Sequence, residues 1–390
     1  MQKLKLFLLL FIAFSALFYV VDRYRKQSPL KLKESITTIN LPRNTAFTAI
    51  DQELRNSSQH FFDQTLLRSR FNGGILVARN GKIIFEQYQG LKNVLSGEPI
   101  DSNTAFHLAS VSKTFTAMAI LKLWENAALL LDDPVTKYLE GFPFPLITIR
   151  NLLSHRSGLP NYVHFVEKMG WDTHRFVTNT DILQLLIDNA DKLKPGRANA
   201  YFDYCNTNYA LLALIVEKVS QLSFSDYLNK VFFKPLGMNN SFVFSIDMVE
   251  SVLPSYKFNN QREPLMFLDA IYGDKNIYST PRDMMKWDFA LSKDQLFAEK
   301  TLEEAFKGYS YERRGTRNYG LGWRLVEMPT GKKIIYHNGW WHGNNTVFSR
   351  LPDDSTAIIV LGNKFNRSIY QAKKIAGIFK GYGIQSDDDE

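Results

Sequence analysis

The stretch KIIYHNGWWHGNNTVFSRLPDDSTAIIVL, residues 333–361, decides the fold of this chain. It holds three runs rich in β-branched and aromatic residues, at 333–337, 345–350 and 356–361. The turn residues Pro352-Asp353-Asp354 separate the last two runs, a pattern that predicts consecutive antiparallel strands. A helix at residues 369–379 is expected to follow them.

A second pair of strands is predicted towards the other end of the chain, at residues 74–78 and 83–88. They flank Asn80-Gly81, a dipeptide typical of two-residue hairpin turns, and follow an expected helix at 52–69. Between the two strand regions, residues 110–242 show helical periodicity. Strands at both ends with helices between them predict an α+β fold. Its antiparallel sheet is built from both chain ends, is flanked by helices and carries a mainly helical insert.

The N-terminus has the pattern of an export signal. Lys3 and Lys5 precede an uninterrupted apolar run at residues 6–21. We expect residues 1–26 to be a signal peptide or an uncleaved signal anchor, because no clear cleavage site follows and the run is slightly short for a bilayer span. The alternative, a buried N-terminal helix, would have to be apolar all round. The expected location of the catalytic part is the periplasmic or extracellular side, with residues 6–21 in the membrane if the leader is retained.

Three further parts are expected along the chain. Residues 27–56 are polar and irregular, which is typical of a tether. Residues 57–382 form the folded domain, and residues 383–390 form an acidic tail that is solvated.

Composition narrows the classes of function. The chain has 390 residues, of which 45% are hydrophobic and 22% charged, as in ordinary globular proteins. The net charge is +8, but Lys and Arg are scattered along the sequence, so we expect no nucleic-acid partner. Cys205 is the single cysteine, which excludes an intrachain disulfide and a cysteine-based metal site. His337 and His342 could alternatively ligate a metal, but no carboxylate stands at a helpful spacing, so no metal is expected.

The first group of residues that could carry chemistry is Ser110-Val111-Ser112-Lys113, at the head of an apolar helix expected at 114–124. A residue three positions on lies on the same helical face, so the amine of Lys113 can reach the hydroxyl of Ser110. A desolvated amine that has lost its proton can activate a serine. The alternative is a capping serine beside a surface lysine, and the same Ser-x-x-Lys pattern recurs at residues 28–31.

Two further groups follow later in the chain. Tyr204-Cys205-Asn206 precedes a strongly helical stretch, and its phenol and amide could accept a proton and bind a substrate carbonyl, although such residues near turns are often structural. His337-Asn338-Gly339 ends a predicted strand, where an open edge and a glycine would let a substrate approach. The backbone N–H of Trp340 could be one oxyanion donor and that of Ser110 the other.

In this order, the three groups resemble the motifs of the penicillin-recognising serine enzymes. Their spacing suits the branch with class C β-lactamases, D-alanyl-D-alanine carboxypeptidases and related esterases. Further segments are similar to recurrent segments of that family: Leu152 to Pro160, Lys234 to Met238, Ile277 to Thr280 and Tyr319 to Trp323. The resemblance covers about residues 71–379. It implies Ser110 as nucleophile, Lys113 and Tyr204 as general base and acid, and a substrate-binding set made of Asn206, His337, Gly339 and Trp340.

The chain departs from the family pattern at two places. His337 stands where class C β-lactamases carry lysine, and a mostly neutral imidazole binds a substrate carboxylate less strongly, which puts β-lactam turnover in doubt. Lys275-Asn276 stands where relatives usually show a glycine pair, and we expect it to reshape one rim of the cleft. The bulky Trp340 and Trp341 suggest a narrowed aromatic pocket.

The predicted reaction is acyl transfer through an acyl-enzyme on Ser110, without metal or organic cofactor. The expected substrate is an ester or amide: a D-amino-acid peptide of the cell wall, a carboxylic ester or a β-lactam. Two other classes are weighed against it: a membrane-tethered penicillin- or peptidoglycan-binding module that does not turn over, and a non-catalytic scaffold. Gly-x-Ser-x-Gly, His-Glu-x-x-His and Gly-x-x-x-x-Gly-Lys-Ser/Thr patterns are absent from the sequence.

Overall fold

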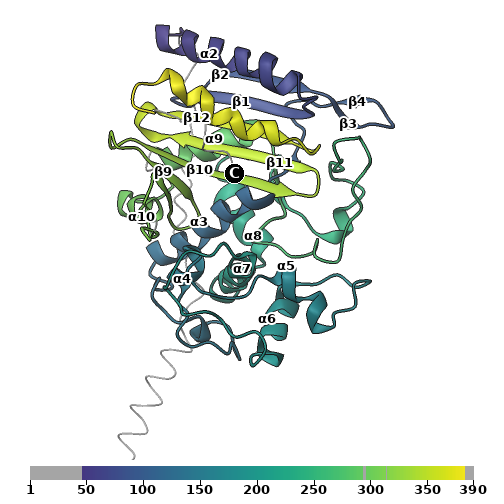
Figure 1. Cartoon of the computed structure of the whole chain (residues 1–390), viewed down its shortest axis with the longest axis vertical. Coiled ribbons are helices and arrows are strands. Elements are labelled where there is room, and N and C mark those ends of the chain that lie inside the picture. The colour runs from purple at the N-terminus through teal and green to yellow at the C-terminus, as the bar shows by residue number, and fades with distance from the viewer. Residues whose placement is uncertain (1–45, 293–295, 313, 383–390) are drawn as a thin grey trace, which may run out of the picture. The chain divides into compact units, whose positions relative to one another are not determined.

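A seven-stranded, wholly antiparallel sheet organises the protein (Figure 1). The computed structural model describes residues 46–292, 296–312 and 314–382, which all belong to one unit spanning residues 37–390. Across the sheet the strands follow the order β2 (Lys82–Gln89), β1 (Gly73–Arg79), β12 (Thr356–Gly362), β11 (Asn344–Leu351), β10 (Lys333–Trp341), β9 (Arg324–Glu327) and β8 (Arg317–Tyr319).

The two chain ends meet in the pairing of β1 with β12. All seven residues of β1 have a partner there, from Gly73 opposite Gly362 to Arg79 opposite Thr356. The β1–β2 hairpin turns at Asn80-Gly81, where both residues have positive φ (53° and 72°), as the twist of a two-residue hairpin demands. The predicted α+β fold, with its sheet built from both ends, is confirmed.

One face of the sheet is covered by the first and last helices, α2 (Ala49–Phe61) continued by η1 (Phe62–Leu67), and η8 (Arg367–Ile378). We call this the outer face. Its core consists of apolar side chains such as Leu54, Ile75, Val360 and Ile369, all buried. Both helices were expected from the sequence.

The opposite, inner face packs against α9 (Pro281–Ser292) and against η2 (Ala109–Val111), which leads into α3 (Ser112–Glu125). The insert below the sheet in Figure 1 is mainly helical, as predicted. Its elements are η3 (Val135–Lys137), α4 (Ile149–Leu153), α5 (Tyr162–Phe165), η4 (Glu167–Met169), α6 (Asn179–Asp188), α7 (Asn206–Ser220), α8 (Phe224–Leu228) and η5 (Asn229–Phe233).

Small elements complete the chain. A three-stranded sheet has the order β5 (Phe106–His107), β7 (Ile277–Ser279), β6 (Phe242–Val243), and a two-stranded sheet joins β3 (Leu91–Asn93) to β4 (Glu98–Pro99). The remaining helical turns are η6 (Ile246–Met248), α10 (Glu299–Ala305) and η7 (Pro352–Asp354).

The structure corrects two expected boundaries. β10 was expected to end at residue 337 but continues to Trp341, because Trp341 pairs with Asn344 across a tight turn in which His342 has φ 51°. Residues 49–56, expected in the tether, belong to α2, which begins after the capping residue Thr48. The expected leader, residues 1–26, and the acidic tail, residues 383–390, lie outside the described residues. Among the helices that the structure does describe, none has the length and apolarity needed to cross a bilayer.

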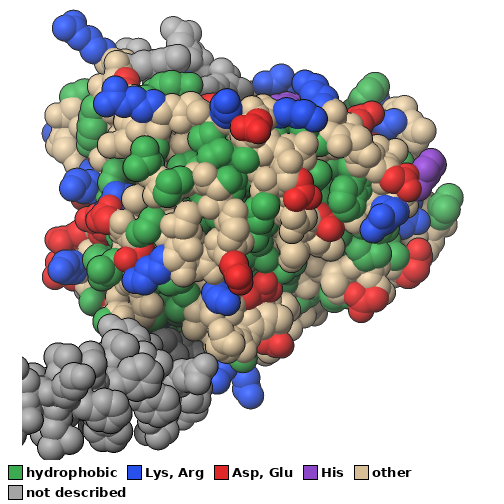
Figure 2. Space-filling model, turned by 90° about the horizontal axis from the view of Figure 1, so that it is seen from below, with side chains coloured by type: hydrophobic (Ala, Val, Ile, Leu, Met, Phe, Trp, Pro, Cys, Tyr) green, Lys and Arg blue, Asp and Glu red, His purple; other side chains and the backbone are tan. Residues whose placement is uncertain are grey.

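Charge on the surface is mixed. On the face seen in Figure 2, basic and acidic side chains are interspersed and no basic patch gathers. This distribution agrees with the scattered Lys and Arg of the sequence.

Candidate active site

Ser110 and Lys113 form a hydrogen-bonded pair at the start of α3. Lys113 Nζ donates to Ser110 Oγ at 3.0 Å and to the carbonyl oxygen of Asp274 at 2.9 Å, and the lysine side chain is buried. Ser110 was expected in the first turn of an α-helix; it lies instead in the 3-10 turn η2 that precedes α3. The i, i+3 contact survives because side chains three apart also share a face in a 3-10 turn.

The backbone before Ser110 is strained. Ala109 has φ 48°, a left-handed conformation that costs a non-glycine residue about 1 kcal/mol or more. Such strain persists only where surrounding contacts hold it, and here the N–H of Ala109 donates to Nδ1 of His107 at 3.0 Å. This contact holds the backbone directly before Ser110.

Tyr204 lies beside this pair. Lys113 Nζ is 5.0 Å from the centre of the Tyr204 ring, and the ring packs on His155 at a centroid distance of 4.4 Å. The following residue, Cys205, donates its N–H to His155 Nδ1 at 3.1 Å, which fixes the segment just before α7. The structure therefore brings together Ser110, Lys113 and Tyr204, three residues that sequence reasoning singled out.

Asn206 is the first residue of α7 and lines the same cleft as Ser110. Its Oδ1 atom is buried, and it has no hydrogen-bond partner among the residues that the structure describes. A buried amide oxygen without a donor is costly, so it is a natural acceptor for a bound group.

The second half of β10 forms an open strand edge along the cleft. β9 pairs with β10 only from Lys333 to Tyr336, so in the described part of the chain the ladder on that side stops before His337. Gly339 is required there, because a Cβ would lie 2.5 Å from the carbonyl oxygen of Leu108 and 2.2 Å from Thr346 Oγ1. This close approach lets Gly339 and Trp340 line the cleft with Ser110.

His337 lies behind this edge. The side chain points to the inner face and is 1% exposed. Nδ1 is 2.7 Å from the carbonyl oxygen of Asn338, so it carries the proton, and Nε2 accepts from the Tyr319 hydroxyl at 3.3 Å. Burial, followed by the charges of Arg324 and Lys113, holds the pKa of His337 well below its usual range. The imidazole is neutral, and the expected contact with a substrate carboxylate is not open to it in this arrangement.

The cleft has a volume of about 790 Å³. Its lining includes Arg324, which sequence reasoning missed; the guanidinium carbon lies 5.3 Å from the centre of the Tyr204 ring. The signal was present, because Arg324 directly follows the segment Tyr319 to Trp323 that resembles a recurrent family segment. Trp340 and Trp341 also line the cleft, and Trp340 stands at its rim with 63% of its surface exposed.

Comparisons with known proteins agree with this geometry. The family described as Beta-lactamase matches residues 59–378. Penicillin-binding protein 4* of Bacillus subtilis is 32% identical over 342 residues, which cover 82% of this chain and 74% of the relative.

Solved structures give the same picture. A penicillin binding protein from Bacillus halodurans has a TM-score of 0.71 at 26% identity, with 82% of this chain and 99% of that chain covered. An octameric penicillin-binding protein homologue from Pyrococcus abyssi has a TM-score of 0.71 at 25% identity, with 85% and 77% covered. The resemblance seen in the sequence is confirmed: this chain belongs to the beta-lactamase family and is a serine hydrolase.

Proposed function

We propose that Ser110 is the nucleophile of an acyl-transfer reaction on an ester or amide, with Lys113 and Tyr204 handling its proton. The observation that carries this proposal is the 3.0 Å contact between Lys113 Nζ and Ser110 Oγ in a buried setting that opens into the cleft. A nucleophile and a base at this distance form the geometric signature of covalent catalysis.

Ser110, Lys113, Tyr204 and a water molecule account for every bond change and proton transfer of this reaction. Ser110 Oγ forms a bond to the substrate carbonyl carbon, and its proton passes to Lys113 or to Tyr204. When the tetrahedral intermediate collapses, the bond to the leaving group breaks and that group takes the proton. Water then attacks the acyl-enzyme, releases the acid and restores the Ser110 hydroxyl. Lys113 and Tyr204 both remain candidates for the base, because Lys113 contacts the hydroxyl and Tyr204 lies beside Lys113 in the same cleft.

Two sets of polar groups would bind the substrate. The backbone N–H groups of Ser110 and Trp340 would hold the oxyanion, as in other acyl-transfer sites. The Oδ1 atom of Asn206, buried without a donor among the described residues, would accept an N–H group of the substrate. This acceptor favours amide-bearing acyl groups, such as D-amino-acid peptides, over simple esters.

Arg324 would supply the positive charge that is missing at His337, where class C β-lactamases carry lysine. His337 is neutral and buried, whereas Arg324 lines the cleft beside Tyr204. A guanidinium pairs well with a carboxylate, so we place a substrate carboxylate at Arg324. Cell-wall D-amino-acid peptides and β-lactams both carry such a group.

We also propose that the protein works outside the cytoplasm, held at the membrane by residues 6–21 if the leader is retained. The apolar run behind Lys3 and Lys5 supports this location. Protease added to intact cells and to spheroplasts tests it: the domain should be digested only when the outer side is accessible. If the domain were digested only after the cytoplasmic membrane had been broken, the proposed location would be wrong.

The function is tested with the full-length chain, a fluorescent penicillin and 4-nitrophenyl acetate. Intact mass should show an acyl adduct that Ser110→Ala abolishes and that Ser225→Ala, an exposed serine on α8, leaves unchanged. Ester turnover should follow the same pattern. An adduct that forms without release would favour the non-turnover binding module, and no adduct with either reagent would contradict the proposal.

A further inference from the structure

The segment Gly273-Asp274-Lys275-Asn276 passes behind the catalytic pair, and its last three side chains are buried. Lys275 and Asn276 thereby place two polar side chains in the interior of the protein. A buried lysine is rare unless it is paired. Its contacts therefore need an explanation.

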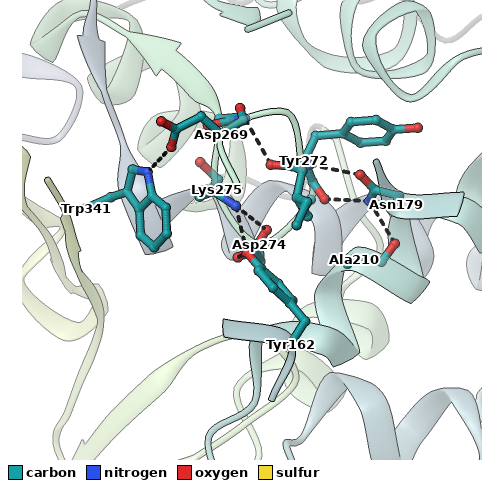
Figure 3. A network of polar contacts seen from close by, with 12 residues as sticks. Tyr162, Asn179, Ala210, Asp269, Tyr272, Asp274, Lys275 and Trp341 are labelled. Atoms are coloured by element: carbon teal, nitrogen blue, oxygen red, sulfur yellow. Dashed lines mark hydrogen bonds and ion pairs between the residues drawn. The ribbon is translucent and has the colours of Figure 1, made fainter. Parts of the chain in front are cut away.

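Lys275 joins three separate parts of the structure (Figure 3). Its ammonium donates to the Tyr162 hydroxyl on α5 at 2.6 Å and lies 3.6 Å from Asp274 Oδ1. It also lies 4.7 Å from the centre of the Trp341 ring, at the end of β10. The insert, the segment 273–276 and the sheet edge are thus tied to one cation.

The network around Lys275 is completed by Tyr162, whose hydroxyl donates to Asp274 Oδ2 at 2.6 Å. Burial and the neighbouring Asp274 raise the pKa of Tyr162 well above its usual value, so the phenol keeps the proton that it donates. Asp274 Oδ2 is held by the phenol, whereas Oδ1 has no hydrogen-bond partner among the described residues and lies at ion-pair distance from the Lys275 side chain. The backbone of Asp274 is fixed accordingly.

That fixed backbone is what Lys113 contacts. The carbonyl oxygen of Asp274 accepts from Lys113 Nζ at 2.9 Å, and the carbonyl of Gly273 accepts from Thr116 Oγ1 at 2.6 Å. The amine of Lys113 is therefore held between Ser110 Oγ and a carbonyl that Lys275 and Tyr162 keep in place.

Asn276 is linked through His107 to Ala109, the residue before Ser110. Its Oδ1 is 2.9 Å from Nε2 of His107, and its amide nitrogen donates to the carbonyl oxygens of Asp269 and Ile271. Nδ1 of His107 accepts from the N–H of Ala109, so Nε2 carries the proton and donates to Asn276. Asn276 thereby fixes the imidazole that holds the strained residue before Ser110.

We propose that Lys275 and Asn276 are positioning residues for the catalytic pair: Lys275 places the amine of Lys113 through Asp274, and Asn276 places the turn of Ser110 through His107. The inference rests on the proposed role of Ser110. A purely stabilising role is a weaker explanation, because a buried ion pair contributes little to stability compared with apolar residues of the same volume.

Charged and titratable groups face the two lysines from every side. Around Lys275 they are Asp274 and Asp269 from its own loop, Tyr162 from α5 and Lys113 from α3. Around Lys113 they are Tyr204 and Tyr209 from the α7 region, with His155 and His337 nearby. Burial lowers the pKa of Lys275, and the carboxylates of Asp274 and Asp269 oppose that shift.

The test compares Lys275→Met with a matched control. Arg350→Met breaks another buried ion pair, to Asp288 at 2.6 Å, on residues that do not line the cleft. With 4-nitrophenyl acetate we expect Lys275→Met to lower kcat about ten- to a hundredfold and to change KM by less than about threefold. The split between an affected kcat and a preserved KM is what a displaced catalytic group predicts. Arg350→Met should lower stability and leave both readouts unchanged.

Two further variants separate positioning from folding. Asp274→Asn combined with Lys275→Met removes both charges of the pair, so stability should return towards the wild type while kcat stays low. Asn276→Gly removes the contact to His107, and the backbone tolerates glycine because Asn276 has φ 72°. We expect its kcat to fall about tenfold, as a small misplacement of a nucleophile does.

Either of two results would overturn the inference: a wild-type kcat in Lys275→Met, or a kcat that recovers with stability in the double variant. An unchanged kcat in Asn276→Gly would remove the role of Asn276. Ser110→Ala in the same assay keeps the two proposals apart, because turnover by that variant would overturn the catalytic role of Ser110 itself.

Discussion

Both faces of the main sheet bury apolar side chains, but the inner side buries charged side chains as well. Under α2 and η8 the outer face is filled with apolar groups such as Leu54, Val360 and Ile369. On the inner side, the region around α3 buries Lys113 and Lys275 among hydrogen-bonding partners. Apolar burial is the main source of stability, whereas buried charge is costly even when it is paired. The difference indicates that the outer face supplies stability and the inner side holds the reactive groups.

The largest effect on activity is expected from removing the amine of Lys113 on the inner side. Lys113→Met should lower kcat/KM at least about 10³-fold, because a positioned base is removed. The free energy of unfolding should stay the same or rise, since an apolar side chain of similar length replaces a buried polar amine. Ester kinetics and urea unfolding measure the two quantities. Activity within tenfold of the wild type would contradict the role of Lys113.

The converse change on the outer face should affect only stability. Leu54→Ala removes a fully buried side chain of α2, so the free energy of unfolding should fall by about 3 kcal/mol while kcat/KM per folded molecule stays constant. Leu67→Ala, where the side chain is 40% exposed, is the matched control and should cost less than about 1 kcal/mol. Equal losses in the two variants would show that burial on this face is not what stabilises the fold.

A low pH should decrease the free energy of unfolding, because the inner side buries histidines. Burial lowers the pKa of His107 from 6.5 to about 4, so the unfolded chain binds the proton more readily between these values. Stability is fully present above pH 6.5 and falls as the pH drops towards 4. Over this range the wild type should lose about 3 kcal/mol more than His107→Gln. Urea unfolding at pH 7 and pH 4 measures the difference, and parallel curves for the two proteins would refute it.

A smaller effect on the outer face tests the start of α2. The Thr48 hydroxyl accepts from the N–H of Asp51, and the Asp51 carboxylate accepts from the N–H of Thr48. Thr48→Ala should lower the free energy of unfolding by about 1 kcal/mol and leave ester turnover unchanged. Thermal unfolding detects the loss. A change in kcat instead would mean that the two faces are not independent.

Local rules were enough to predict much of the architecture and the contact between Ser110 and Lys113. The Asn80-Gly81 hairpin requires positive φ at both residues, and the structure shows it. The Ser110 to Lys113 contact follows from a spacing of three residues in a helical turn. Both are set by neighbours in the sequence, so a pattern in the sequence is sufficient to find them.

Contacts between distant segments could not be predicted in this way. Arg324 reaches Tyr204 because β9 pairs only with the first half of β10, a consequence of sheet register. The strand was expected to end at residue 337, yet β10 continues to Trp341 because it pairs with β11. Lys275 was expected only to reshape a rim; its place between Tyr162 and Trp341 depends on three segments meeting.

The pairing of β1 with β12 determines when the protein can become active during its synthesis and folding. The strand that carries Gly339 and Trp340 is followed by β11 and β12, and β12 must find β1 across almost the whole length of the domain. Contacts between such distant segments form late and slowly. The enzyme therefore becomes active only after β12 has been synthesised and has paired with β1. A chain that ends before residue 356 would contain Ser110 and Lys113 but would be inactive.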